Sequence, residues 1–434
     1  MIRNLILLMT ACLWLYSCKE DNFNTPKGST EVPQQVDVTG VRNISGASVI
    51  YFSHPNDKHL KYVKAVWTTD DGIEYDATAS FYTDSILVDG FGAEGLYKVK
   101  LYSVSDGGTY SEPKEAEVNP TRPPYLVAFD EMEILPNFLG IRVVSENETG
   151  AKLTFRTFKK DTVMNEYVEV GTDYLLSPNI EYYNRGHAAD TLQYFGVQIR
   201  DRWGHWSPMK EASVIPWFEM ELPKNKFAEV ALCNLSGDGS EVPDQTGQAL
   251  PSNFWGHKQH TWNGSNTSFA SMWDGTKLGT ASVCHHTKPL APLPQHFTFD
   301  LGAQYMLSRL VLWPRNDNAN LFRGGHPQIV RVYAATYNGA FPEELVDDIN
   351  DPDAWMDLGI FYFSRADGSF EPYPGTGDRT AEDNALLEAG HEMILKATDQ
   401  KVRYLRIQTV KCFAANTKAG AVMISELSVF GSDK

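Results

Sequence analysis

Cysteine is scarce in this chain, with five present among 434 residues. Two lie within the first 18 residues, and the other three are Cys233, Cys284 and Cys412. Three cysteines allow at most one disulfide and leave one thiol over, so no disulfide framework holds the fold together. The sequence leaves open which of the three pair.

Positive charge is also in short supply. Lys and Arg number 38 against 55 Asp and Glu, which gives a formal net charge of −17 at pH 7. Nucleic-acid phosphates attract basic surfaces, so this balance argues against a nucleic-acid partner. It also disfavours highly sulfated glycans as ligands.

Long apolar runs are missing after residue 16, so no later segment is expected to cross a membrane. The run from Asn4 to Tyr16 is too short for a spanning helix, which needs about 20 residues. It follows a single positive charge, Arg3, and ends at a small residue, Ser17, before Cys18. This order is typical of a secretory signal peptide.

The end of that run carries a more specific pattern. Leu15-Tyr16-Ser17-Cys18 resembles the lipobox of bacterial lipoproteins, in which the cysteine is lipidated and becomes the new N-terminus. Lys19-Glu20-Asp21 is similar to the signal that exports Bacteroides-type lipoproteins to the cell surface. The resemblance implies an outer-membrane protein, anchored through lipid on Cys18 and exposed on the cell surface. An ordinary signal peptide with an unrelated cysteine is the alternative.

Motifs of several enzyme classes are absent as well. The chain has no Gly-x-Ser-x-Gly, no His-Glu-x-x-His and no phosphate-binding glycine loop. His391-Glu392 begins no zinc motif, since Leu395 stands where the second histidine is required. Counting acidic pairs does not exclude a glycosidase dyad in so acidic a chain. The balance favours a non-catalytic protein.

Between residues 37 and 222 the chain contains short alternating runs broken by Gly, Asp, Asn and Pro. Residues 49–52, 63–67 and 85–88 are three such runs, each typical of a β-strand. No stretch in this region sustains a helical period. The pattern predicts an all-β fold of the sandwich type.

An internal repeat divides this region in two. Residues 97–113 parallel residues 195–208: each has an alternating strand, a turn with Asp and Gly, an aromatic residue, then Ser and Pro. The repeat resembles the last hairpin of fibronectin type III domains, in which the aromatic that opens the strand often forms a tyrosine corner. The resemblance implies two fibronectin III/Ig-like sandwiches that serve as spacers or interaction surfaces, joined at Pro123-Pro124. One larger sandwich is the alternative.

From residue 224 the apolar strands are well separated. Alternation predicts half-buried strands of an antiparallel sandwich or barrel at 296–302, 309–315, 328–333, 402–407 and 423–430. Five blocks in order resemble a discoidin, or coagulation factor V/VIII type C, domain: Ala-Ser-Met-Trp-Asp-Gly, Phe-Thr-Phe-Asp-Leu-Gly, Ser-Arg-Leu-Val-Leu-Trp-Pro-Arg, Tyr-Leu-Arg-Ile and Ile-Ser-Glu-Leu. The resemblance implies a galactose-binding-like β jelly roll.

The predicted layout follows from these patterns. It consists of a lipoprotein signal peptide (1–17), a tether (18–36), two fibronectin III-like modules (37–119 and 120–222) and a discoidin-like binding domain (224–434). Residues 236–268 and 341–390 exceed the family's usual core and are expected to be loops or short helices. The whole resembles Bacteroides-type surface lipoproteins encoded among glycan-utilisation genes.

The discoidin resemblance implies a structural calcium site. In sugar-binding members, the Asp of the Asp-Gly turn and a Glu near the C-terminus help to hold the ion. Here these are Asp274 and Glu426, with Thr280 as a third ligand, and such oxygen donors suit calcium. The positive charge of Lys277 would repel a calcium ion at this place. An Asp that caps a turn and a Glu paired with an arginine explain the same residues.

The resemblance also implies a ligand site on loops at one end of the barrel. A sugar needs a flat aromatic side chain against its ring and planar polar groups for its hydroxyls. The candidate contacts are Trp255, Trp262, His285, His286, Asn316, Asn318, Phe322, Arg323 and His326. Trp255 and Trp262 are equally explained as plugs that hold a long loop down. Trp273 and Trp313 lie beside or within strand patterns and are expected in the core.

Several histidines cluster in these loops. His257 and His260 have His-x-x-His spacing, and His285 and His286 are adjacent. No carboxylate or cysteine pattern completes a known zinc site, and adjacent side chains on a strand point to opposite faces. A contact to ligand is favoured over a metal role.

Together the patterns predict a non-catalytic surface lipoprotein that binds a glycan or polysaccharide through its C-terminal domain. Protein partners of a glycan-uptake complex are expected beside it, and calcium is the one cofactor considered. The alternative is an adhesion or scaffold lipoprotein that binds a protein or envelope partner. A glycoside-active enzyme is less favoured.

Overall fold

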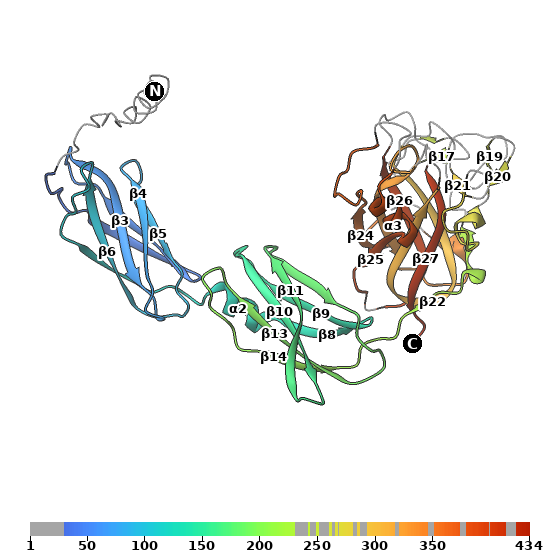
Figure 1. Cartoon of the computed structure of the whole chain (residues 1–434), viewed down its shortest axis with the longest axis horizontal. Helices are drawn as coiled ribbons and strands as arrows, with labels where there is room; N and C mark the ends of the chain where they lie inside the picture. The colour runs from blue at the N-terminus through green and yellow to red at the C-terminus, as the bar shows by residue number, and fades with distance from the viewer. Residues whose placement is uncertain are drawn as a thin grey trace, which may run out of the picture. The chain divides into compact units, whose positions relative to one another are not determined.

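The computed structural model describes residues 30–230 without a break and most of the remaining chain (Figure 1). The further described residues are 242–243, 249–250, 260–262, 265–267, 269–280, 284–286, 293–316, 321–345, 351–373, 379–398, 400–413 and 422–434. No helix in these ranges is long and apolar enough to cross a membrane. Cys18 lies outside them.

The first module confirms the predicted all-β sandwich. One sheet has the order β1 (Asp37–Ile44), β2 (Ala47–Ser53), β5 (Ser85–Asp89). The other has the order β4 (Glu74–Ser80), β3 (Leu60–Thr68), β6 (Tyr97–Ser105), β7 (Lys114–Val118). Alternate residues of both sheets are buried in one core, which includes Ile50, Val63, Trp67, Val88 and Val99. The three predicted strands lie within β2, β3 and β5.

The predicted tyrosine corner is present in this module. The hydroxyl of Tyr97 lies 3.0 Å from the carbonyl oxygen of Ala93 and 2.5 Å from Oδ2 of Asp70. Burial, followed by the bond to Asp70, raises the pKa of the Tyr97 phenol. The repeat has Phe195 at the matching position, which has no hydroxyl to make these bonds.

The second module repeats the two-sheet plan. One sheet has the order β12 (Asn179–Asn184), β9 (Gly140–Glu146), β8 (Glu133–Asn137). The other has the order β11 (Glu166–Leu175), β10 (Leu153–Asp161), β13 (Gln193–Arg200), β14 (Lys210–Val214).

A helix that the sequence reading missed opens this module. The expectation of no helix between residues 37 and 222 is wrong, because α2 spans Pro124–Glu131. Pro124 at its first turn has the backbone angle that a helix needs and lacks only an N–H that would be unpaired there. Eight residues are too few for an apolar period to stand out.

The described chain forms two compact units. The second contains residues 135–142, 183–193 and 213–434. Within it, the side chain of Glu219 is 4% exposed and accepts hydrogen bonds from Arg185, from Ser308 and from Nε and Nη2 of Arg309, the last two at 3.1 and 2.9 Å. Burial opposes ionisation of Glu219, but the bonds from Ser308 and Arg309 and the charges of Arg185 and Arg309 lower its pKa.

The C-terminal domain is the predicted jelly roll. Its main path of strands runs β15 (Met220–Glu221), β27 (Met423–Ser432), β22 (Gln295–Pro314), β26 (Val402–Cys412), β23 (Pro327–Ala335), β24 (Trp355–Tyr362). Off this path, β16 (Ala228–Val230) and β25 (His391–Ile394) pair with β22, and β21 (His285–His286) pairs with β27. Short hairpins join β17 (Val242–Pro243) to β18 (Ala249–Leu250) and β19 (His260–Trp262) to β20 (Ser265–Thr267).

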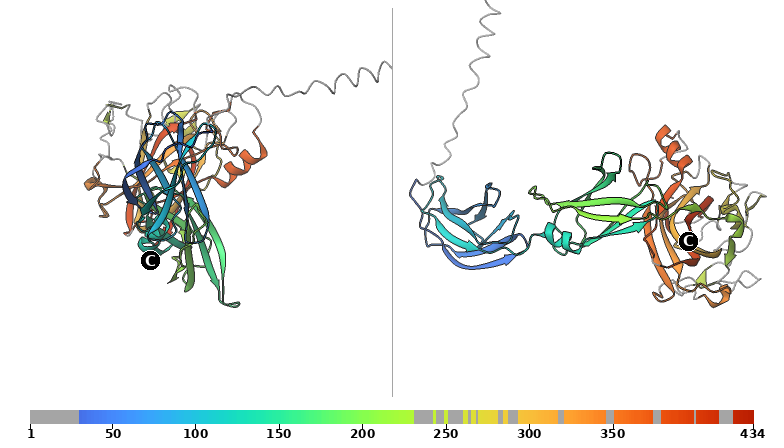
Figure 2. Two further views of the ribbon diagram at one scale, coloured as in Figure 1. Left: turned by 90° about the vertical axis from the view of Figure 1, so that its left-hand side faces the viewer. Right: turned by 90° about the horizontal axis from the view of Figure 1, so that it is seen from below.

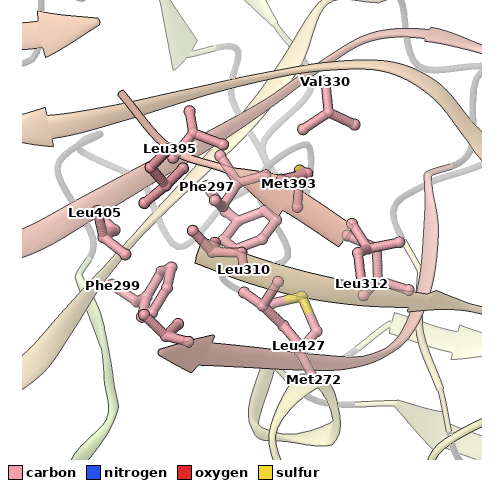
Figure 3. Close-up of a cluster of buried hydrophobic side chains, with 14 of the residues drawn as sticks. Met272, Phe297, Phe299, Leu310, Leu312, Val330, Met393, Leu395, Leu405 and Leu427 are labelled. Carbon is pink, nitrogen blue, oxygen red and sulfur yellow. The ribbon is translucent and has the colours of Figure 1, made fainter. Parts of the chain in front are cut away.

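Side chains from these strands fill a main core, and Val230, Tyr333, Trp355 and Tyr404 belong to a second, smaller buried cluster. Figure 3 draws 14 side chains of the main core and labels ten, including Phe297, Leu310, Val330, Leu405 and Leu427, which converge from different strands. Trp313 is buried as predicted, and Trp273 packs against this core. Figure 2 shows the strands of this domain in two further views.

Strand β22 differs from the prediction of two separate strands. It runs for 20 residues, pairing with β26 from Gln295 to Asp300 and again at Tyr305, and with β27 from Met306 onward. Gly302, at φ +78°, lies at the change of partner, and a Cβ there would come within 2.7 Å of Lys226. The glycine that reads as a strand end therefore marks a bend within one strand shared by two sheets.

The segment predicted as loops or short helices at 341–390 also contains a strand. It holds η4 (Pro342–Glu344) and α3 (Ala381–Ala389) as expected, but β24 lies between them and extends the sheet beyond β23. Gly359, at φ +134°, interrupts the alternation of β24, which hid the strand.

Gly390 gives a test of the packing around α3. It follows the helix at φ +82°, and a Cβ would lie 2.6 Å from both Trp313 and Val311. We expect Gly390→Ala to lower the unfolding free energy by about 3 kcal/mol, since it adds overlap to backbone strain. Gly368→Ala, at φ +80° with open space around it, should cost only about 1 kcal/mol. Urea unfolding of both variants measures the difference, and equal losses would contradict the packing argument.

Candidate functional site

Described residues from two of the predicted ligand loops, the one at His285-His286 and the one from Asn316 to His326, meet at the start of β27. β21 pairs with it, with His285 opposite Ile424 and His286 opposite Met423. The N–H of Met423 donates to the carbonyl of Gly325 at 2.8 Å. Asn316 belongs to the same end, because its N–H donates to Gly279 at 2.9 Å and Nη1 of Arg315 lies 3.7 Å from the sulfur of Met423. We call this end of the jelly roll, formed by residues 284–286, 315–316, 321–326 and 422–424, the rim.

Two predicted contacts are partly exposed on the rim. Asn316 and Arg323 are both half-buried, so each retains surface for a ligand. One offers an amide and the other a guanidinium, the planar groups that bind paired hydroxyls. His285 is buried beside β27 and supports the rim rather than facing outward.

Phe322 and His326 require a correction. Both are buried, with Phe322 fully so, and the ring of Phe322 lies 4.9 Å from that of His326 and 5.3 Å from that of Phe413. Neither presents a face or an edge to an outside sugar. Sequence position in a Gly- and Asn-rich loop suggested exposure, but the loop folds back into the core below it.

The remaining predicted contacts fall outside what can be described. Trp255 and Asn318 lie outside the described residues, and only the backbone is described for Trp262, in β19, and for His286. His257 also lies outside the described residues, and only the backbone is described for His260. Their predicted roles stay predictions.

A pair of buried histidines lies beneath the rim. Nε2 of His326 is 2.8 Å from Nε2 of His391, and the N–H of Phe322 donates to Nδ1 of His326 at 2.8 Å. Because that Nδ1 is an acceptor, the neutral ring carries its proton on Nε2 and donates it to His391. Phe363 stacks on His391 with ring centroids 4.3 Å apart. The pair fixes the 321–326 loop against β25 and was not found from sequence, since 65 residues separate its members.

Burial keeps both rings neutral. It lowers the pKa of His391 to about 4 and, together with repulsion from His391, holds the pKa of His326 well below its ordinary value of 6.5. Cys412, at the end of β26, is also buried, which raises the pKa of its thiol to about 12. Within the described residues no group of three or more His, Cys, Asp or Glu side chains is placed to hold a metal ion.

The residues of the predicted calcium site are only partly brought together. Glu426 is fully buried on β27, and its Oε2 accepts the N–H of Gly275 at 2.9 Å. Asp274 and Thr280 are exposed, and Oδ1 of Asp274 accepts the N–H of Thr276 at 2.8 Å. Glu426 and the neighbouring Ser425, which bonds the carbonyl of Thr276 at 2.7 Å, fix the turn after Trp273.

A cavity that the sequence reading missed lies near the other end of β27. Its volume is about 170 Å³, and Trp217, Phe218, Met306, Ser432 and Lys434 are among its lining residues. Nζ of Lys434 lies 2.6 Å from Asp190 and 5.2 Å from the centre of the Phe218 ring. The adjacent aromatic residues Trp217 and Phe218 are the sequence feature that could have indicated this cavity.

Comparison with known proteins gives families without assigned activities. Three family models match, each described as a domain of unknown function: DUF4959 at residues 33–120, DUF5126 at 121–225 and DUF5000 at 273–431. A search of curated proteins found no match.

Among solved structures, the chain is similar to a SusE-like protein, at 22% identity over 71% of this chain and 99% of that one, with a TM-score of 0.46. It is similar to a family 32 carbohydrate-binding module from Clostridium perfringens in complex with galactose, at 14% identity over 49% of this chain and 98% of that one, TM-score 0.26. A two-domain fibronectin type III segment from chicken tenascin matches at 11% identity over 42% of this chain and 98% of that one, TM-score 0.20.

The buried histidine pair predicts a pH dependence of stability. Below pH 6.5 the two histidines bind protons in the unfolded chain but not in the folded chain. The free energy of unfolding therefore decreases as the pH falls from 6.5 toward 4. At pH 5.5 the loss should be about 1 kcal/mol for each histidine relative to pH 7.5. Urea unfolding of the C-terminal domain at both pH values measures it.

His391→Gln should reduce this pH dependence by about one histidine's share, since one titrating ring is removed. His59→Gln in the first module is the control and should leave it unchanged. A full pH dependence in His391→Gln would contradict the assignment.

Proposed function

We propose that this chain is a non-catalytic, lipid-anchored cell-surface protein that binds carbohydrate at the rim of its C-terminal jelly roll. The observation that carries the proposal is the meeting of two separate loops at the start of β27, with Arg323 and Asn316 partly exposed there. The sequence resemblance to discoidin-like domains independently points to ligand binding at such loops.

The chemistry of the rim suits a neutral glycan. A guanidinium and an amide present several donors and an acceptor without needing a charged ligand. The aromatic face that a sugar ring also requires would come from Trp262 or Trp255, as the sequence predicts. One such site binds weakly, so useful retention would come from many anchored copies engaging one polymer.

The two N-terminal modules serve as spacers in this proposal. Their shared plan of two packed sheets would hold the jelly roll away from the membrane, and the tether at residues 18–36 would add reach. Partners of a glycan-uptake complex would assemble beside the protein on the same membrane.

Arg323→Ala tests the rim directly. Losing the guanidinium should weaken retention by a recognised polysaccharide in affinity electrophoresis by about ten- to a hundredfold, since a charge-assisted bond pair contributes about 1.5–3 kcal/mol. Trp262→Ala should weaken it similarly. Arg331→Ala is the matched control and should retain binding, because it removes the same charge from a partly exposed pair between Arg331 on β23 and Asp357 on β24.

The same assay separates the alternatives. Retention equal in Arg323→Ala and Arg331→Ala would place the ligand elsewhere. Failure with every plant and host polysaccharide, together with capture of one protein from the cell envelope, would favour adhesion. Release of reducing ends by the purified chain would overturn the non-catalytic assignment.

Cys18→Ala tests the anchor. A chain without the lipidated thiol has no acyl groups to hold it in the outer membrane, so it should move from the membrane fraction to the soluble fraction and lose label from radioactive palmitate. Cys12→Ala is the control and should stay anchored and labelled. Unchanged membrane association of Cys18→Ala would contradict the lipobox assignment.

A further inference from the structure

Lys224 sits where the sequence resemblance expects a metal cation. Its ammonium forms an ion pair with Oε1 of the fully buried Glu426 and lies 2.9 Å from Oε1 of Glu221. The other oxygen of Glu426 accepts the N–H of Gly275. We call these three side chains and this N–H the Lys224 cluster.

The fold delivers Lys224 to this place by strand pairing. β15 runs antiparallel to β27, with Met220 opposite Gly431 and Glu221 opposite Phe430, and the N–H of Leu222 donates to Val429 at 2.8 Å. Continuing that register brings residue 224 alongside residues 426–427. The short helix η2 (Lys224–Lys226) then turns the chain away toward β16.

The two carboxylates differ in their response to the ammonium. Burial raises the pKa of Glu426, opposed by the bond and charge of Lys224. Burial also opposes ionisation of Glu221, but the bonds from Ser428 and Lys224 lower its pKa. The ammonium is therefore the counter-charge that permits a buried carboxylate at position 426.

The residues present do not fit a calcium ion. Calcium requires six to eight oxygen donors at 2.3–2.6 Å, whereas an ammonium and an N–H point at the two oxygens of Glu426. A divalent ion among these groups would face the charge of Lys224 at close range. A second ammonium, Lys277, lies 4.4 Å from the ring centre of Trp313, the residue paired with Glu426 across the sheet.

We propose that the ammonium of Lys224 takes the place of the cation, so that this jelly roll carries its own counter-ion and folds without calcium. It links Glu221 of the entry strand β15 to Glu426 of β27, and the other oxygen of Glu426 holds the turn at Asp274–Gly275. A bound metal would serve the same mechanical purpose only where it is available.

The first experiment uses the unchanged full chain. After equilibrium dialysis against calcium chloride, the protein should contain no bound calcium above the level of the buffer, and its melting temperature should be the same with EDTA and with calcium. One calcium per chain, or a loss of several degrees in EDTA, would overturn the proposal. This readout does not involve a glycan, so its failure and that of the proposed binding function are distinguishable.

The second experiment replaces the ammonium. Lys224→Met leaves Glu426 buried without its counter-charge, so its melting temperature should fall by about 5 °C or more. The double variant Lys224→Met/Glu426→Gln should recover part of that loss, because the neutral amide needs no cation. Lys226→Met, on the exposed side of the same short helix, is the matched control and should melt like the unchanged chain.

Calcium then distinguishes the two states of the site. Millimolar calcium chloride should raise the melting temperature of Lys224→Met, whose acidic pocket is now open to a cation, and leave the double variant and the unchanged chain where they were. An equal rise in the unchanged chain and Lys224→Met would overturn the proposal, as would a Lys224→Met chain that melts like Lys226→Met. If Lys224→Met does not fold, Lys224→Arg should fold and remain insensitive to EDTA, and sensitivity of that variant would overturn it.

Discussion

The pairing and burial of β27 is the constraint on which the C-terminal domain depends. This strand bonds to β22 along its length, to the entry strand β15 near its end and to β21 near its start. Its apolar side chains enter the core at Ile424, Leu427 and Val429, while Ser425 and Glu426 hold the turn that follows Trp273. The rim, the entry of the chain and the core therefore share one element, and a shift in its register would disturb all three.

Three buried carboxylates among the described residues of this domain are paired with a cation from a distant part of the chain. Glu219 is bonded by Arg185 and Arg309, Asp300 by Arg403 through two bonds of 2.9 Å, and Glu426 by Lys224. Such pairs add little net stability, since desolvation offsets the attraction, but removal of one partner is costly. Their value is in fixing which segments meet, and this is how an acidic chain specifies one arrangement of long connections.

Sequence patterns were sufficient for the sheets and insufficient for their irregularities. Alternation located β2, β3, β5, β23, β26 and β27, because half-buried strands must alternate to cover one face. It missed α2, which is too short to show a period, and β24, in which Gly359 breaks the alternation. It divided β22 at Gly302, since a glycine with positive φ reads as a turn whether the chain stops or only bends.

The site was harder to predict than the fold for a related reason. Sequence resemblance named the rim loops, and the structure brings His285, Asn316 and the 321–326 loop to one place. It could not separate Arg323, which keeps exposed surface, from Phe322 beside it, which is fully buried. Nor could it foresee that Lys224, 202 residues away, would meet Glu426, because that contact depends on the register of β15 against β27.

The direction of β15 has a mechanical consequence. The chain enters at Met220, opposite Gly431, whereas the rim lies at the other end of β27. Under the function proposed above, a polymer bound at the rim and pulled by flow would draw β27 one way along its axis, while the proposed membrane anchor would draw β15 the other way. Their bonds would then be strained in shear, all at once, rather than opened one after another like a zipper. In this orientation the few hydrogen bonds between β15 and β27 would share the load.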